Sequence, residues 1–312
     1  MIEKERSKKS GASSFLIHHD KVKFRDLVDR AATLAGFYAP LMEKDYYLTF
    51  ILSRISDLSA NLIFKGGTCL NKIYYSYYRL SEDLDFSMRL PDDSATRGNR
   101  RKVMQTIKDK IAAFADTLGM RLEGTENAGR NESKQYIYYF AYDAVTLPVA
   151  QTIKLEISLR FNPLLPPESR RIQHLYTHPF TGVPLFDAGH VNCLALDEIV
   201  SEKLRAAALR KDIAPRDFYD IDFILRNKFN LKNKQIIDLF RKKLAEDNGD
   251  TDLKQYLVNM GRSDKEIKDM RGRIQEELFE VLTGKERENF NLDIALKRIN
   301  QAMALMIGES VK

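Results

Sequence analysis

Hydrophobic positions follow two different periods along this chain. Residues 24–38 and 41–60 carry apolar side chains at helical spacing, and Pro40 is expected to end the first of these helices. The apolar run at 62–64 predicts a strand that meets a glycine turn, and 69–78 is expected to form a short helix. The same criteria predict further strands at 83–86, 120–123, 135–142 and 151–160, a helix at 101–118, and loops at 91–100 and 124–134.

The character of the pattern changes again near residue 195. Residues 161–190 are rich in proline and are expected to be irregular with short strands, whereas the pattern from 196 onward is almost entirely helical. We therefore predict an α+β protein with a flexible tail at 1–20, a mixed α/β domain at 21–195 and a helical domain at 196–312.

Composition narrows the class of protein. The 312 residues include 50 Lys+Arg and 44 Asp+Glu, a net charge of +6, and 44% are hydrophobic, as in a globular chain. Neither an apolar run of membrane-spanning length nor a secretory signal is recognisable, so no membrane partner is expected. Two cysteines, Cys69 and Cys193, cannot form a disulfide framework, and we expect a reducing cytoplasm.

The segment with the clearest chemistry contains Asp83 and Asp85. Because they are two residues apart on a predicted strand, both carboxylates face the same side, where a divalent cation would offset their repulsion. Glu156, on another predicted strand, is a candidate third carboxylate, and Lys154 on the same face would pair with it or with a phosphate. Free backbone N–H groups of the Gly66-Gly67 turn are candidates for binding phosphate. A solvated acidic turn is the alternative explanation.

A second cluster lies in the helical part. Lys203 and Arg210 are seven residues apart and share one helix face, and Asp217 and Asp220 share a face of the next helix. Residues 203–234 contain nine Lys+Arg and four Asp, a local charge of +5. Such a cluster suits nucleotide phosphates, and it is equally typical of a solvated, salt-bridged helical pair.

Taken together, five short segments resemble the AbiEii/AbiGii-type nucleotidyltransferase toxins of the DNA polymerase β-like superfamily. They are KGGT at 65–68, RLSEDLDF at 79–86, KLEIS at 154–158, EKLRAAALR at 202–210 and RDFYDI at 216–221. The resemblance implies a mixed sheet flanked by helices, with a helical C-terminal domain that contributes to the active-site cleft. It also implies that Asp83 and Asp85 bind Mg²⁺ or Mn²⁺ with Glu156 as the third carboxylate. Further roles implied are nucleotide binding by Lys65, Gly66, Gly67, Thr68, Ser81, Lys154, Arg210 and Arg216, and catalysis by Asp83, Asp85, Lys203 and by Asp217 or Asp220.

The function implied by this resemblance is that of a toxin. Such a protein transfers a nucleoside monophosphate from an NTP, in some members to the 3′ end of tRNA, and thereby inhibits translation and growth. A winged-helix antitoxin encoded nearby, acting at the operon rather than necessarily on the toxin itself, is the implied partner in toxin–antitoxin or phage-defence systems. For tRNA, residues 97–134 offer nine Lys+Arg against five Asp+Glu, a local charge of +4.

Two other functions fit the same residues. One is nucleotidylation or phosphorylation of a protein or small molecule in the same pocket. The other is a non-catalytic nucleotide-binding or interaction module, which the intact carboxylate pair disfavours. A zinc site at His174, His178 and His190 is disfavoured because Pro179 and Pro184 oppose a helix there, and no GxxxxGK segment of a P-loop is present.

Overall fold

The computed structural model describes residues 17–91, 96–124 and 128–308. Regular structure is already present at η1 (Ile17–His19), before residue 21, and the rest of the predicted tail lies outside the described residues. Helix α1 (Lys21–Ala35) ends at Gly36, whose left-handed conformation (φ 73°) caps it, so Pro40 is not its stop signal. Pro40 instead lies in the first turn of α2 (Ala39–Leu58), where proline is favoured.

One mixed sheet forms the centre of the molecule. Its strands are β1 (Leu62–Lys65), β2 (Asp83–Met88), β3 (Arg121–Glu123), β4 (Gly129–Arg130), β5 (Gln135–Tyr142), β6 (Gln151–Ser158), β7 (Glu168–Arg171) and β8 (His190–Cys193). The strand order is β3-β5-β6-β2-β1-β8-β7, with β4 paired to β5. The pairs β1–β8 and β2–β6 are parallel and the other pairs are antiparallel, which confirms the predicted mixed sheet.

The two faces of this sheet differ in chemistry. Leu84 and Phe86 of β2 are fully buried, and Phe140 of β5 contacts Phe114 of α4 (Arg97–Thr117) on the same face. Tyr47 of α2 stacks on Tyr142 of β5, so α2 covers this apolar face as well. The opposite face carries the polar side chains of β2 and β6 and is free to host chemistry.

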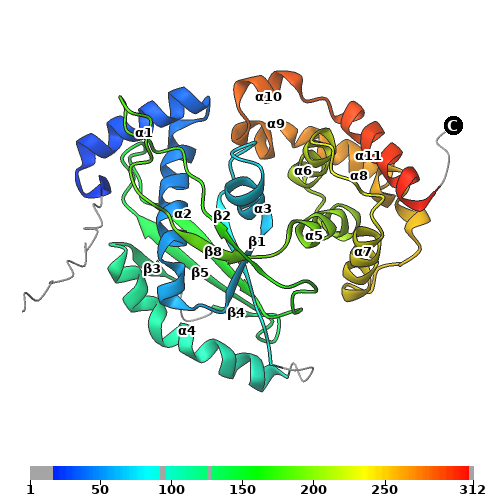
Figure 1. Ribbon diagram of the computed structural model, residues 1–312, viewed down its shortest axis with the longest axis horizontal. Helices are drawn as coiled ribbons and strands as arrows, with labels where there is room; N and C mark the ends of the chain where they lie inside the picture. Colours follow the sequence, from blue (N-terminus) through cyan, green and yellow to red (C-terminus); the bar gives the residue numbers. More distant parts are fainter. Residues whose placement is uncertain (1–16, 92–95, 125–127, 309–312) are drawn as a thin grey trace, which may run out of the picture.

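The remaining helices gather on the side of β1 away from α1, α2 and α4 (Figure 1). They are α5 (Leu196–Leu209), α6 (Pro215–Arg226), α7 (Lys234–Glu246), α8 (Asp264–Gly272), α9 (Ile274–Glu277), α10 (Gly284–Asn289) and α11 (Leu292–Ile307). Three short 3₁₀ turns, η4 (Leu253–Tyr256), η5 (Asn259–Gly261) and η6 (Phe279–Val281), connect some of them. The buried apolar residues of both parts join in one core cluster.

Two helical predictions need correction. Instead of one helix at 69–78, the chain forms α3 (Gly66–Cys69) and a π-helical turn, η2 (Leu70–Tyr74), followed by Ser76 and Tyr77 at positive φ. This path brings Lys72 and the Tyr77 hydroxyl to the buried Asp45 at 2.6 and 2.8 Å, and the helical pattern is lost only after Tyr74. Helix α4 begins at Arg97 rather than 101, because Thr96 caps its first turn. The predicted loop 124–134 also contains the short strand β4.

Candidate active site

Strand register brings three carboxylates together on the polar face of the sheet. Asp85 of β2 pairs with Lys65 of β1 on one side and with Glu156 of β6 on the other, and Asp83 pairs with Lys154. Directly paired residues point to the same face, with Cβ atoms about 5 Å apart. The structure therefore assembles one patch, called here the carboxylate face, from Asp83, Asp85 and Glu156 with Lys65 and Lys154 beside them.

The charges of the carboxylate face are incompletely balanced. Burial, followed by repulsion from Glu156, raises the pKa of Asp85 to about 6, although Lys65 opposes this effect. Burial also raises the pKa of Asp83, against the attraction of Lys154 and Lys44. An added cation would stabilise the ionised form of both aspartates.

The donor set of the carboxylate face fits a hard divalent cation, because all of its acidic groups are oxygen ligands. Within residues 17–91, 96–124 and 128–308, however, no three His, Cys, Asp or Glu side chains converge as a ready-made metal cluster. Glu156 is directed to Lys154, with Oε2 and Nζ 2.8 Å apart. Asp83 and Asp85 are thus the candidate ligands, and Glu156 would join them only by leaving Lys154.

The glycine turn packs directly against the strand of the two aspartates. Gly66 has φ +78°, and a Cβ atom there would overlap the Asp85 carboxylate. A Cβ atom at Gly67 would lie 2.6 Å from a guanidinium nitrogen of Arg79 and 3.2 Å from the Ser81 hydroxyl. Thr68 donates a hydrogen bond from Oγ1 to the Asp83 carbonyl oxygen at 2.5 Å. Both glycines are therefore required for this close approach of the turn to the carboxylate face.

Lys203 is held in a buried ion network rather than at the carboxylate face. Its Nζ lies 2.7 Å from Asp220 and 3.0 Å from Asp217. Arg79 donates to both Asp220 carboxylate oxygens, from Nε at 2.6 Å and from Nη2 at 2.8 Å. Burial alone would raise the pKa of Asp220, but Arg79 and Lys203 hold it well below its usual range. The network joins the segment before β2 to α5 and α6, and the position of Arg79 in it was not predicted from the sequence.

The two predicted arginines have different surroundings. Arg216 lies 3.1 Å from Glu82, next to the carboxylate face, and Lys44 of α2 lies 3.2 Å from the same carboxylate. Arg210 is half exposed and pairs with Asp217 at 2.9 Å, so it joins the buried network at its edge. The anchoring function of Glu82 was not predicted, although it lies between Ser81 and Asp83.

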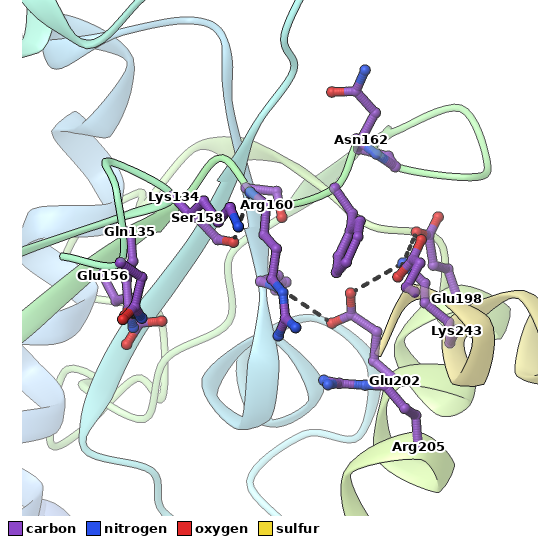
Figure 2. A pocket seen from close by; sticks show the side chains of 16 residues that line it. Lys134, Gln135, Glu156, Ser158, Arg160, Asn162, Glu198, Glu202, Arg205 and Lys243 are labelled. Carbon is purple, nitrogen blue, oxygen red and sulfur yellow. Dashed lines mark hydrogen bonds and ion pairs between the residues drawn. The ribbon is translucent and has the colours of Figure 1, made fainter. Parts of the chain in front are cut away.

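A cavity of about 450 Å³, called here the catalytic cavity because Lys65 and Glu156 of the carboxylate face line it, opens beside these two residues (Figure 2). Strand β6 and the segment after it contribute Ser158 and Arg160, while α5 and α7 contribute Glu198, Glu202, Arg205 and Lys243. Glu202 connects its two walls, with Lys65 at 3.5 Å and Lys243 at 3.3 Å. No local pattern in the sequence links Arg160, Arg205 and Lys243 to the carboxylate face, so these residues were not predicted.

The mixed sheet, the carboxylate face beside a glycine turn and the C-terminal helices define the class of protein as a nucleotidyltransferase. The family model described as "Nucleotidyl transferase AbiEii toxin, Type IV TA system" matches residues 51–306, and the chain belongs to this family. The protein is therefore a nucleotidyltransferase toxin of the type IV toxin–antitoxin class, and an antitoxin partner is implied.

Among solved structures, MenT4 agrees in fold with this chain. MenT4, a nucleotidyltransferase toxin from Mycobacterium tuberculosis H37Rv, is 19% identical with a TM-score of 0.55, over 92% of this chain and 99% of that chain. JHP933 from Helicobacter pylori is 16% identical with a TM-score of 0.46, over 86% of this chain and 93% of that chain. No curated protein matches the chain. The helices that the structure describes include none long and apolar enough to cross a membrane.

Proposed function

We propose that this toxin transfers a nucleoside monophosphate from an NTP to the 3′ end of tRNA, using Mg²⁺ or Mn²⁺, and thereby inhibits translation and growth in the cytoplasm. The observation that carries the proposal is the carboxylate face itself, where strand register aligns Asp85 with Glu156 and Lys65. In this proposal a metal ion on Asp83 and Asp85 supplies Lewis-acid stabilisation of charge on the triphosphate.

The residues around the metal ligands would have separate tasks. Lys65 and Lys154 provide fixed positive charge on either side of Asp85 and Asp83, which suits the triphosphate of the nucleotide. The turn at Gly66 and Gly67 lies tightly against Asp85 and Ser81, and its backbone N–H groups would be the candidates for binding phosphate. Lys203 forms an ion pair with Asp220, which also binds Arg79. Its task is to hold the helical part in place against the sheet.

The reaction itself exchanges the phosphoanhydride bond between the α- and β-phosphates of the NTP for a phosphodiester bond. The oxygen of the terminal ribose hydroxyl attacks the α-phosphorus, the bond to the bridging oxygen breaks, and pyrophosphate leaves. The hydroxyl proton passes to a carboxylate of the carboxylate face. Orientation of the two substrates against fixed charges supplies most of the acceleration in this kind of transfer.

An α-labelled NTP incubated with bulk tRNA and Mg²⁺ tests the proposal. Asp83→Asn and Asp85→Asn are expected to stop label transfer, whereas Asp143→Asn, a matched change at an exposed carboxylate, leaves it intact. Oxidising the terminal ribose of the tRNA with periodate is expected to stop the transfer as well. Transfer that persists in Asp83→Asn would contradict the role of the carboxylate face.

The same assay separates the alternative reactions. Label that reaches the acceptor from the γ-position of the NTP, and not from the α-position, would identify phosphorylation instead. Growth arrest that persists in an Asp83→Asn/Asp85→Asn variant would identify a non-catalytic mode of action. We also propose that the antitoxin is a winged-helix protein encoded nearby, which co-expression of the neighbouring gene with the toxin tests through restored growth.

A further inference from the structure

A second cavity of about 580 Å³ lies between α4 and strands β4 and β5, on the face of the sheet that α4 covers. Arg97, Arg101, Lys108 and Arg130 line it, together with the buried Tyr136 and Tyr138. Glu132 is the one carboxylate among the described residues that line it, so the local charge is 4 − 1 = +3. We call this cavity the basic groove.

Within the part of the chain that the structure describes, the cations of the basic groove have no carboxylate partner. None of the four forms an ion pair with another described residue, whereas Lys243 in the catalytic cavity contacts Glu198 and Glu202. Lys108 lies over the ring of Tyr136 at 5.1 Å, which holds its ammonium group at the groove wall. Unpaired cations on a fixed wall bind phosphate without first breaking a salt bridge.

The spacing along α4 suits a polymer better than a small anion. Positions 97, 101 and 108 fall within about 40° of one another around the helix axis, because each residue advances by roughly 100°. Eleven residues span about 16 Å along a helix. A nucleic-acid strand in helical form carries about one phosphate per 3.4 Å, so this row extends along about five nucleotides.

The basic groove also adjoins the catalytic cavity. Asn131 lines both, and the turn around it separates them. Asn131, Glu132 and Ser133 have φ of 47°, 55° and 63°, a conformation that non-glycine residues rarely adopt. Arg100 of α4 donates to the Glu132 carbonyl oxygen at 2.9 Å, which ties this turn to the groove wall.

From this continuity we propose that the basic groove binds the sugar–phosphate backbone of the acceptor RNA, with the RNA passing over the Asn131–Ser133 turn into the catalytic cavity. This inference rests on the proposed function, since it places the RNA whose 3′ end reaches the carboxylate face. A tRNA is far larger than a cavity of about 450 Å³, so most of its contacts must lie outside it.

Binding of tRNA measured by fluorescence anisotropy from 50 to 300 mM salt tests the groove without requiring chemistry. Arg101→Glu/Lys108→Glu is expected to weaken binding at least tenfold at low salt. It should also flatten the slope of log K against log salt by about 1.8, at roughly 0.9 per lost phosphate contact. Lys265→Glu/Lys268→Glu on α8 carries the same charge change on exposed side chains and should alter binding less than twofold.

Transfer kinetics add a second measurement. The groove variant is expected to raise KM for full-length tRNA and to leave transfer to a short single-stranded RNA of three or four nucleotides unchanged. Equal losses in the groove and control variants would overturn the inference, as would competition by polyglutamate as strong as that by RNA.

The proposed function and this inference fail in different ways. If tRNA accepts no label, yet the groove variant still loses salt-dependent RNA binding, the RNA site stands and the proposed reaction is wrong. If tRNA accepts label and the groove variant binds it as tightly as the unmodified protein, the reaction stands and the groove assignment is overturned.

Discussion

A methyl group at position 66 would test whether contact with the glycine turn positions the Asp85 carboxylate. Alanine at φ +78° costs about 1–2 kcal/mol in backbone strain. Alanine also lowers the conformational entropy of the unfolded chain relative to glycine, and this offsets about 0.4–1 kcal/mol of that cost. Overlap of its Cβ atom with the Asp85 carboxylate adds about 1–3 kcal/mol, as for other overpacked sites. We therefore expect Gly66→Ala to lower the free energy of unfolding by about 1–4.5 kcal/mol.

Gly182→Ala is the matched control for Gly66→Ala. Gly182 has φ +68°, and nothing lies within 4 Å of the position of its added Cβ atom, so that variant reports backbone strain alone, about 1 kcal/mol. Urea unfolding of both variants measures the difference. In an Asp85→Ala background, the loss of unfolding free energy from Gly66→Ala should exceed that from Gly182→Ala by less than about 1 kcal/mol, because the carboxylate is gone.

The same methyl group should act on catalysis. A shift of about 1 Å in a metal-binding carboxylate is enough to reduce transfer about 100-fold, so Gly66→Ala should lose most label transfer while Gly182→Ala retains it. If Gly66→Ala were no less stable than Gly182→Ala and kept more than a third of the activity, the argument that the glycine turn positions Asp85 would be refuted.

Three further predictions follow from the electrostatics of the structure. Asp220→Asn leaves Arg79 and Lys203 without their shared buried counterion and should lower the free energy of unfolding, measured with urea, by about 3–5 kcal/mol. Asp217→Asn leaves Asp220 in place and should cost less. Equal losses in the two variants would contradict the central position of Asp220 in the network. Chelation by EDTA should stop label transfer and added Mg²⁺ should restore it, so transfer that survives chelation would exclude the metal from the mechanism. Burial lowers the pKa of His18 to about 4, so its neutral form stabilises the fold above pH 6.5 and this contribution disappears as the pH falls from 6.5 to 4. Because the His18 ring is partly exposed and solvent screens its charge, the free energy of unfolding should drop by only about 1–2 kcal/mol over that pH window. The drop should be smaller in His18→Gln. Identical plots of unfolding free energy against pH for the two proteins would contradict the role of His18.

The polar face of the sheet was predictable from local pattern. Alternation along 83–86 and 154–158 assigns Asp83, Asp85 and Glu156 to polar strand faces, because side-chain direction has a period of two in any strand. The helical spacing of Lys203 and Arg210, and the placement of Gly66 and Gly67 after an apolar run, were equally local signals. The family resemblance rested on these same short segments, and the matched family model covers them.

Other features depended on residues far apart in the chain. The pairing of Arg79 with Asp220 joins positions 141 residues apart, and no periodicity relates them. The helix predicted at 69–78 ends at Tyr74 rather than 78, because the chain turns at Ser76 and Tyr77, and the Tyr77 hydroxyl thereby reaches the buried Asp45 on α2.

By itself, then, the sequence determined which side of each strand is polar and where the chain turns at glycine, because covalent geometry sets both within a few residues. Only the tertiary structure decided that Glu156 lies beside Asp85, that Lys203 is occupied by Asp217 and Asp220, and that a basic groove adjoins the catalytic cavity at Asn131. The physical reason is that strand register and helix packing result from the burial of apolar surface over the whole domain. The total area buried depends on contacts between distant segments, so no single segment determines it.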